Sequence, residues 1–333
     1  MKPLALPPNQ FHRFYSGGAR IDALRGVPAG EDGRPEDWVG STATSWGDDA
    51  EGLSRLADGT ILRDAIAAEP EGFLGPDHVE RWGADPALLV KLLDAGQRLP
   101  VHFHPGRRFA REHLGLAFGK TEAWIILEAE PGAEVHVGPR EPLDRATVRG
   151  WVDTQDPAEM LAALQPLPVA SGDAVLVPAG TLHAIGAGIL LLELQEPTDL
   201  SVLLEWRPFG VDTGAEHLGL GWDTALEAID LEPADVGALR GGGAGAGALL
   251  PPAADPYFRA ERVRPGDALA PSFAILLAVA GAGTLRTGAG DELELRRGAT
   301  ALVPFAAGDS TLTGDLEAIR CLPPVPTTGE GAW

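Results

Sequence analysis

Cysteine is almost absent from this chain of 333 residues, in which Cys321 stands alone. A single thiol excludes an internal disulfide framework and a thiolate zinc cluster. No uninterrupted apolar run reaches membrane-spanning length. The proline-rich start, residues 1–10, lacks the basic and apolar blocks of a signal peptide. We therefore expect a cytoplasmic protein without membrane segments.

Positive charge is also scarce, because 26 basic residues stand against 48 acidic ones and give a formal net charge of −22. Such a surface repels nucleic acid and anionic membranes, since phosphate-rich partners need a basic face. An anionic ligand would need a local cationic pocket. The only lysines are Lys2, Lys91 and Lys120. Lysine and arginine are not interchangeable, so each retained lysine is a candidate for a specific role.

Short apolar runs broken by Gly and Pro begin at Leu99. They predict strands at 101–105, 123–130, 133–138, 173–178 and 188–195, which together indicate a closed all-β unit. Before them, PALLVKLLD (86–94) is typical of either a helix or a buried strand. After Asp156, with Pro157 in its first position, the pattern predicts a helix, and a second helical pattern follows at 221–229.

A second set of strands is predicted at 273–287, 291–305 and 309–314, beyond the glycine-rich stretch 241–247 that we take as a linker. RRGATALVPF (296–305) repeats the order of ASGDAVLVPA (170–179), which is a Gly turn, an apolar strand and then Pro. We therefore expect a mainly β protein of two jelly-roll barrels with additional helices.

The predicted division assigns residues 1–210 to a metal-binding barrel with helical N-terminal elements. Residues 211–247 are expected to form a helical connection and linker, and residues 248–333 a second barrel. Every histidine lies at or before His217, so the second barrel is expected to be metal-free.

Two histidine motifs suggest a metal site. His102 and His104 are two apart on a predicted strand, so both imidazoles can face the same side. Gly172-x5-Pro178-x-Gly180-x2-His183 combines an incoming strand, a tight corner and a returning histidine, and it is similar to the second motif of the cupin superfamily.

Glu122 opens the strand between these two motifs and is the natural fourth ligand. Three imidazoles and a carboxylate suit one divalent ion, with Zn²⁺ as the first candidate and Mn²⁺, Fe²⁺ or Ni²⁺ also compatible. The histidines outside both motifs are read as structural: His12, His78, His113, His136 and His217.

Three segments carry a resemblance to a known family: residues 86–105, 118–138 and 177–199, the last reading VPAGTLHAIGAGILLLELQEPTD. They resemble the core motifs of class I mannose-6-phosphate isomerases, in a short bacterial form. The resemblance implies a two-cupin fold with one catalytic zinc. It also implies a metal-dependent aldose–ketose isomerase that interconverts mannose 6-phosphate and fructose 6-phosphate through a cis-enediol.

Within this resemblance, His104, Glu122 and His183 match metal ligands of the family, and His102 stands where the family has Gln. Lys120 matches an active-site lysine, Lys91 a phosphate-side lysine, and Glu193 a carboxylate of the active site. Glu193 and Lys120 are the candidates for moving the substrate proton.

Two positions depart from the family pattern. A phosphate-side serine falls on Pro100, and an arginine falls on Leu203. Even spacing from Leu203 suggests that Arg207 replaces the missing arginine on the same strand face. The cluster Arg107, Arg108 and Arg111 either binds phosphate or is a solvated turn.

Other functions stay open from the sequence. One is an isomerase or epimerase of a different or unphosphorylated sugar, which Pro100 and Leu203 suggest. Another is a sugar-binding metal cupin without turnover, and a third is an Fe²⁺ oxygenase, favoured only by His102. In each of these readings the partner is a small molecule, a sugar or sugar phosphate in the first two, and the protein is expected to be a monomer or a small homo-oligomer.

Overall fold

Four antiparallel β-sheets contain the named strands of the computed structural model, which describes residues 1–325. The seven-stranded sheet has the order β13 (Arg240–Gly242), β9 (Asp173–Val177), β6 (Glu122–Ala129), β11 (Ile189–Gln195), β4 (Leu89–Ala95), β3 (Glu36–Val39) and β2 (Gln10–Phe11). The five-stranded sheet has the order β12 (Val202–Leu203), β5 (His102–Phe103), β10 (His183–Ile185), β7 (Glu134–Pro139) and β8 (Leu164–Pro168).

The other two sheets come mainly from the C-terminal part of the chain. The six-stranded sheet has the order β1 (Leu4–Leu6), β19 (Thr300–Val303), β16 (Ala274–Ala280), β21 (Glu317–Leu322), β15 (Arg259–Val263) and β14 (Gly247–Ala248). The three-stranded sheet has the order β18 (Glu292–Arg296), β17 (Ala282–Thr287) and β20 (Ser310–Leu312).

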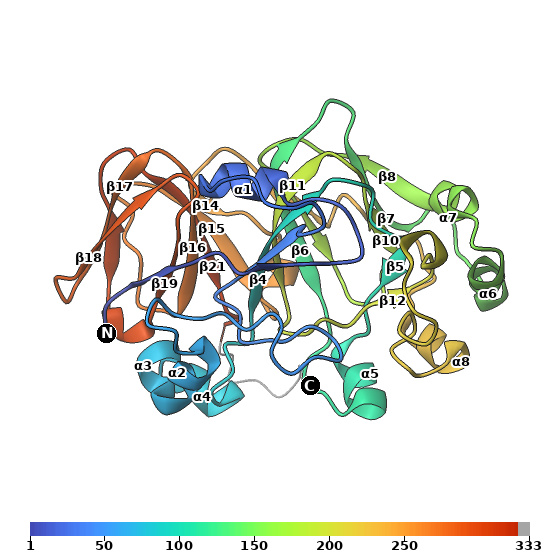
Figure 1. Cartoon of the computed structure of the whole chain (residues 1–333), viewed down its shortest axis with the longest axis horizontal. Helices are drawn as coiled ribbons and strands as arrows, with labels where there is room; N and C mark the ends of the chain where they lie inside the picture. The colour runs from blue at the N-terminus through green and yellow to red at the C-terminus, as the bar shows by residue number, and fades with distance from the viewer. Residues whose placement is uncertain (326–333) are drawn as a thin grey trace.

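The helices are short and lie at the sides and ends of the sheets (Figure 1). The α-helices are α1 (Ala19–Arg25), α2 (Leu62–Ala68), α3 (Pro70–Leu74), α4 (Pro76–Trp82), α5 (Arg107–Phe109), α6 (Arg145–Thr154), α7 (Pro157–Ala163) and α8 (Trp222–Ala225). The 3₁₀ and π turns are η1 (Ala110–Leu114), η2 (Arg207–Phe209), η3 (Leu226–Ala228), η4 (Pro252–Ala254) and η5 (Phe305–Ala307). Within residues 1–325, every helix is too short or too polar to cross a bilayer.

The five-stranded sheet is buried on both faces. Its outer face packs against α6 and α8 through a cluster that includes Phe103 and Trp151. Its inner face and the inner face of the seven-stranded sheet share a second cluster around Trp124 and Val137. The two sheets therefore enclose one interior, and this interior contains the candidate site.

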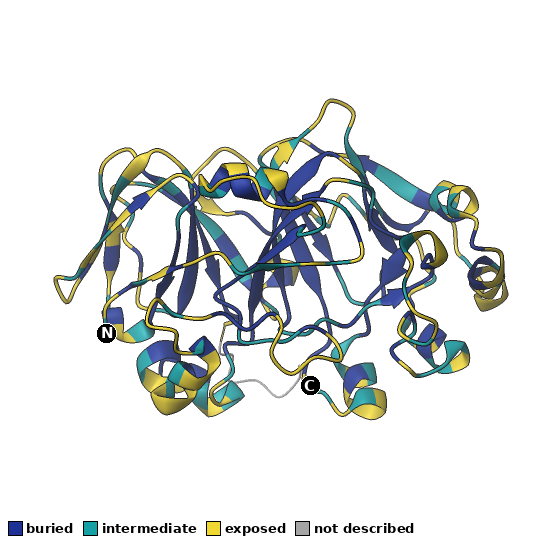
Figure 2. Cartoon of the chain, viewed as in Figure 1, coloured by how far each residue is buried: buried dark blue, intermediate teal, exposed yellow. Residues whose placement is uncertain are grey.

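The seven-stranded sheet packs on its other face against the six-stranded sheet, through a cluster that includes Leu192 and Ile275. The six-stranded and three-stranded sheets enclose a further cluster around Leu276 and Leu285. The layers thus follow one another from helices α6–α8 to the three-stranded sheet, with buried residues running through the middle (Figure 2).

Strand β11 shows how a continuous apolar run serves two cores. Leu190, Leu192 and Leu194 belong to the cluster shared with the six-stranded sheet. Leu191 belongs to the cluster on the opposite face, and Glu193 shares that face because side chains two apart along a strand point the same way. A strand buried on both faces has an almost uninterrupted apolar sequence. Glu193 is the one charged residue of β11 and is therefore a candidate for a specific role.

The strands predicted between residues 101 and 195 are confirmed as β5, β6, β7, β9 and β11. Residues 86–94, ambiguous in the sequence, contain the start of strand β4, which pairs with β3 and β11. The glycine-rich stretch 241–247 is not simply a linker, because Arg240–Gly242 pairs with β9 and Gly247–Ala248 with β15.

The N-terminal strand β1 pairs with β19, so that Leu4 lies opposite Leu302. The start of the chain therefore completes the C-terminal sheet. Nothing in the local sequence of residues 4–6 indicates this partner, and the predicted division of the chain at residues 210 and 247 stays a prediction.

The helix predicted after Asp156 is confirmed as α7. The Asp156 carboxylate accepts hydrogen bonds from the backbone N–H groups of Ala158 (2.9 Å) and Glu159 (3.3 Å). These N–H groups have no partner inside the helix, and a side-chain cap satisfies them.

Asp156→Ala should therefore lower the free energy of unfolding by about 1 kcal/mol, the usual cost of losing an N-cap. Urea denaturation measures the change. Asp153→Ala, whose side chain is 70% exposed, is the control and should change stability by less than about 0.5 kcal/mol. Equal effects of the two substitutions would contradict the capping role.

Candidate metal centre and active-site cavity

A row of side chains crosses the inner face of the seven-stranded sheet. Glu193 on β11 lies opposite Lys91 on β4 and opposite Trp124 on β6, and Lys91 lies opposite Trp38 on β3. Glu122 is two residues before Trp124 and shares its face. The antiparallel register thus brings residues far apart in sequence to one side of the sheet.

Three imidazoles meet this row from the five-stranded sheet. His183 on β10 lies directly opposite His102 on β5, and their ring centroids are 4.0 Å apart. Phe103 packs into the outer cluster, so its neighbours His102 and His104 face inward. One ligand atom from each histidine lies within 4.8 Å of the others, and all three side chains are buried. This group could hold a metal ion.

The corner before His183 depends on glycine. Gly180 has a φ of +88°, a conformation that side chains with a Cβ rarely adopt. Its N–H donates to the carbonyl of His104 (2.7 Å). The Gly–Pro–Gly–His pattern thus connects the two histidine segments directly.

Each histidine is oriented by a backbone carbonyl. The Nδ1 atoms lie 2.8 Å from Pro100 O for His102, 2.7 Å from Leu200 O for His104 and 2.8 Å from Thr181 O for His183. A carbonyl only accepts, so each Nδ1 carries the proton and each Nε2 presents a lone pair. Backbone contacts of this kind are typical of metal-binding histidines.

The buried Nε2 atoms of His104 and His183 have no hydrogen-bond partner in the described chain. Burial and the nearby Lys120 charge lower the pKa of His104 to about 3. Burial also lowers the pKa of His183, and burial together with His183 holds the pKa of His102 well below its usual range. All three imidazoles are therefore neutral at pH 7 and able to coordinate a cation.

Glu122 joins the histidine group at its edge. Its Oε2 lies 3.0 Å from Nε2 of His104 and its Oε1 lies 3.4 Å from Nε2 of His183. The indole N–H of Trp124 donates to Oε1 (3.0 Å) and orients the carboxylate. Burial opposes ionisation of Glu122, but Lys120, His104 and His183 together outweigh it and hold the pKa of Glu122 well below the usual range. The group therefore contains an ionised carboxylate.

A cavity of about 420 Å³ opens beside the histidines. His102, Glu122, Lys120, Lys91 and Glu193 line it. Two of the three lysines of the chain thus face one cavity, as their scarcity suggested. Pro100 and Leu203, the departures from the family pattern, line it as well.

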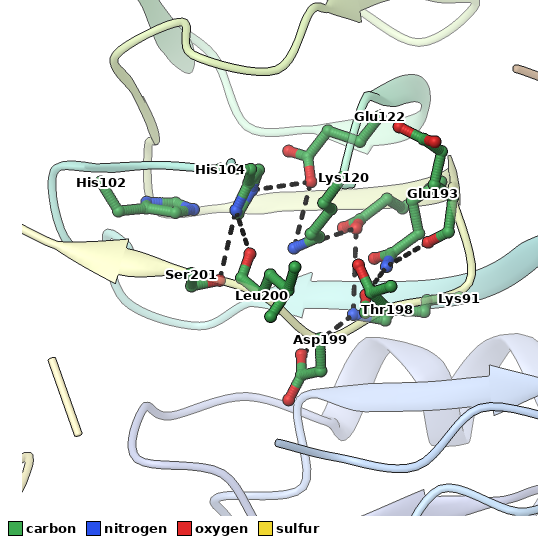
Figure 3. A network of polar contacts seen from close by, with 12 residues as sticks. Lys91, His102, His104, Lys120, Glu122, Glu193, Thr198, Asp199, Leu200 and Ser201 are labelled. Atoms are coloured by element: carbon green, nitrogen blue, oxygen red, sulfur yellow. Dashed lines mark hydrogen bonds and ion pairs between the residues drawn. The ribbon is translucent and has the colours of Figure 1, made fainter. Parts of the chain in front are cut away.

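Lys120 lies between two carboxylates, with Nζ 3.2 Å from Oε2 of Glu122 and 4.0 Å from Oε1 of Glu193 (Figure 3). Burial lowers its pKa, but Glu122, Glu193 and further carboxylates raise it by more. The net shift is upward, so Lys120 is a protonated amine that can donate hydrogen bonds into the cavity.

Glu193 is the least compensated carboxylate of the cavity. Its Oε1 is buried without a hydrogen-bond partner in the described chain, and it lies 3.9 Å from Nζ of Lys91. Burial and the negative charge of Glu122 raise its pKa, against the two lysines, which lower it. A carboxylate with a raised pKa at a cavity wall is suited to accept and return a proton.

The end of the cavity near the N-terminal segment contains charged groups that the sequence did not reveal. Glu36 accepts hydrogen bonds from the Tyr15 hydroxyl (2.5 Å), the Trp38 indole (2.7 Å) and Nε of Arg13 (3.1 Å). Asp199 contacts both Arg13 and Lys91. Sequence reasoning missed these groups, because contacts between residues 13, 36 and 199 are not encoded in spacing.

Arg207 does not reach the cavity. Strand β12 ends at Leu203, and Arg207 begins the 3₁₀ turn η2, where it is exposed and donates to Asp153 O (3.3 Å). The even-spacing argument is therefore wrong, because it assumed that the strand continues.

The arginine cluster also lies outside the cavity. Nε of Arg107 contacts Glu196 (2.5 Å), and Arg108 is exposed and pairs with Glu112. Neither residue, nor Arg111, lines the cavity. The solvated-turn interpretation therefore fits this segment better than phosphate binding.

Comparison with known proteins places the chain near one group. No family model matches it. It is 33% identical over 202 residues to a mannose-6-phosphate isomerase of Streptococcus mutans, covering 60% of this chain and 58% of that protein. It is 39% identical over 118 residues to a mannose-6-phosphate isomerase of Bacillus subtilis. The matched region thus spans less than two thirds of either relative.

Solved structures extend the likeness to nearly the whole chain. The mannose 6-phosphate isomerase of Bacillus subtilis superposes with a TM-score of 0.76 at 22% identity, over 96% of this chain and 99% of that one. A putative mannosephosphate isomerase of Archaeoglobus fulgidus gives 0.75 at 19% identity. The resemblance that the sequence motifs predict is confirmed, in sequence over part of the chain and in fold over nearly all of it.

His183→Ala should abolish stoichiometric metal binding, because it removes a neutral buried imidazole from the centre of the group. Elemental analysis of the purified protein measures the loss. His136→Ala is the matched control, since His136 lies on the neighbouring strand opposite Ala184 and outside the histidine group. Full metal retention in His183→Ala would rule out this ligand set.

Glu36→Gln should lower the free energy of unfolding by about 3 kcal/mol at pH 7, because it breaks a buried charge network. Burial opposes ionisation of Glu36, but Arg13 and Lys91 outweigh it, so its pKa lies below the usual range in the folded state. The stabilisation is thus present above the unfolded pKa of about 4.3 and is lost as the pH falls toward the folded value.

Urea denaturation at pH 7 and pH 4 measures both proteins. The difference between wild type and Glu36→Gln should shrink at pH 4. A difference that stays constant, or that grows on acidification, would contradict the ionised state of Glu36.

Proposed function

We propose that this relative of the mannose-6-phosphate isomerases is a metal-dependent aldose–ketose isomerase that interconverts mannose 6-phosphate and fructose 6-phosphate. The observation that carries the proposal is a buried group of three neutral imidazoles whose member His102 lines one cavity together with Glu122, Lys120 and Glu193. The relatives that match part of this chain are named mannose-6-phosphate isomerases.

The proposed metal ligands are His102, His104, Glu122 and His183. The unpartnered Nε2 atoms of His104 and His183, which lie 3.0 Å and 3.4 Å from the Glu122 carboxylate, support this set. Zn²⁺ suits three nitrogen donors and one oxygen, and Mn²⁺, Fe²⁺ or Ni²⁺ fit the same donors. A divalent ion here would supply electrostatic stabilisation of the negative charge that develops on the sugar oxygens.

Isomerisation moves one proton between C2 and C1 of the sugar while the two oxygens exchange hydroxyl and carbonyl character. Glu193 is the proposed base, because its unpaired Oε1 faces the cavity. Lys120 is the proposed donor to a sugar oxygen. The carboxylates around this lysine raise its pKa and keep the amine protonated.

Lys91 is the proposed substrate-binding residue. Its Nζ lies 3.5 Å from Glu36, 3.9 Å from Glu193 and 3.8 Å from Asp199. These distances exceed those of charge-assisted hydrogen bonds, which are about 2.7–2.9 Å, so the ammonium group keeps donor capacity toward a ligand.

The charge of the cavity supports a coupling between metal and substrate. The charged lining residues are Arg13, Lys91, Lys120, Glu36, Glu122, Glu193 and Asp199. Burial raises the pKa of Glu193 to about 8, so at pH 7 this carboxyl is mainly protonated and three cations face three anions. A divalent ion would add two positive charges, so an anionic sugar phosphate is expected to bind after the metal.

For the architecture we propose that the two pairs of facing sheets form two jelly-roll barrels of the cupin type. We propose the first barrel, within residues 1–210, as the metal-binding one, and a cytoplasmic setting for the enzyme. The names of the relatives favour the isomerase over a sugar-binding protein without turnover.

Metal-loaded protein should convert mannose 6-phosphate to fructose 6-phosphate, and a chelator should abolish the conversion until Zn²⁺ is restored. A coupled assay for fructose 6-phosphate measures it. Absence of turnover on any aldose or ketose phosphate, with metal bound, would refute the proposed function.

Glu193→Gln should lower kcat by about 10²- to 10⁴-fold, the range expected for loss of a general base, while metal content stays stoichiometric. Glu134→Gln, a surface carboxylate 43% exposed, is the control and should keep full activity. An unchanged kcat in Glu193→Gln would exclude this residue as the base.

A further inference from the structure

The segment between β2 and α1 brings one arginine to the candidate cavity. Arg13 is the only arginine among the described residues that line it. Its side chain is 16% exposed, and its guanidinium lies between two carboxylates from distant parts of the chain. The N-terminal segment is thus a wall of the cavity and not only a cover over the sheet.

Arg13 and Lys91 form a closed ring of alternating charge with Glu36 and Asp199. The guanidinium lies 3.1 Å from Glu36 and 3.1 Å from Asp199. The ammonium group of Lys91 lies 3.5 Å and 3.8 Å from the same two carboxylates. Two cations are therefore held side by side by one pair of anions, and all four groups line the cavity.

The carboxylates occupy only part of the guanidinium. Nε donates to Glu36 and Nη2 donates to both oxygens of Asp199. Nη1 makes no hydrogen bond within residues 1–325, which leaves two N–H donors in a fixed plane. These two donors can form charge-assisted hydrogen bonds with an oxyanion, in directions that the planar guanidinium fixes.

Asp199 fixes this arrangement from the other side. It also accepts a hydrogen bond from the backbone N–H of Trp46 (3.2 Å), so the loop around Trp46, the N-terminal segment and strand β4 meet at one carboxylate. Pro100 and Leu203 offer no charge to the cavity, so its cations come from β4, from Lys120 and from Arg13.

We propose that Arg13 binds the anionic end of the substrate, with Lys91 as its partner and with Glu36 and Asp199 as the groups that orient both cations. This rests on the proposed function only for the identity of the substrate as a sugar phosphate. The N-terminal segment then determines the preference for phosphorylated over unphosphorylated sugar.

A second role for Arg13 has to be separated from binding, because its charge also balances two buried carboxylates. Arg13→Gln alone leaves Glu36 and Asp199 undercompensated and can destabilise the fold. Arg13→Gln combined with Asp199→Asn removes one cation and one anion together, keeps the balance of the ring and retains an acceptor for Trp46. If Arg13 only neutralises charge, the double variant regains the wild-type affinity for phosphate.

The experiment uses the metal-loaded full chain and isothermal titration calorimetry with inorganic phosphate, fructose 6-phosphate and fructose. We expect Arg13→Gln and the double variant to bind both phosphate ligands about 10- to 100-fold more weakly, the effect of losing charge-assisted hydrogen bonds. Affinity for fructose should be unchanged. Arg13→Lys keeps the charge but not the planar guanidinium, and its affinity for the phosphate ligands should fall between the affinities of these two variants and that of wild type.

Arg25→Gln is the matched control. Arg25 lies in the same N-terminal region, is 3% exposed and pairs with the buried Asp37, but it does not line the cavity. It should lower the melting temperature without changing the affinity for phosphate.

Wild-type phosphate affinity in the double variant would overturn the proposal, as would an equal loss of fructose and fructose 6-phosphate binding. The result is independent of turnover. Arg13-dependent phosphate binding in a protein that isomerises no sugar phosphate would sustain this inference and refute the proposed function. Normal turnover with an unchanged KM in Arg13→Gln would support the proposed function and refute this inference.

Discussion

The antiparallel pairing of β11 with β4 and β6 is the constraint on which the site depends. Because β11 is buried on both faces, every second residue must suit a different environment. Three leucines pack against the six-stranded sheet, while Glu193 faces the interior beside Lys91 and Trp124. A shift of register by one residue would send Glu193 into an apolar core, where an unpaired carboxylate is costly. The core and the candidate active site therefore stabilise the same register.

Charges in the cavity persist because each is compensated by a group from another strand. Transfer of an ion from water to a protein interior is unfavourable unless it is paired and hydrogen-bonded. Glu36 meets this condition with three hydrogen-bond donors, and Lys120 with two neighbouring carboxylates. Oε1 of Glu193 does not meet it fully, and the neutral Nε2 atoms of His104 and His183 are buried polar atoms that also lack a hydrogen-bond partner in the described chain. Incomplete pairing therefore marks the proposed base and two of the proposed metal ligands, whereas Lys120, the proposed donor to a sugar oxygen, is paired.

Local patterns in the sequence predicted many strands of the five-stranded and seven-stranded sheets. Residues two apart in His102-x-His104 face one side wherever a strand forms, and Gly180 permits the corner before His183 through its positive φ. The cap at Asp156 likewise depends on neighbours in the chain. Each of these is a relation between residues close in sequence, for which backbone geometry alone fixes the outcome.

Other relations depended on which strands pair, and these only the tertiary structure decided. Residues 86–94 became a strand because β3 and β11 flank them, and Arg207 was misjudged because β12 ends at Leu203. The ring of Arg13, Glu36, Lys91 and Asp199 joins four separate segments, and no spacing records it. The sequence by itself determined the motifs that bring the candidate metal ligands together, since these motifs are local. The tertiary structure decided which charges face the same cavity, because long-range pairing sets the orientation of every strand.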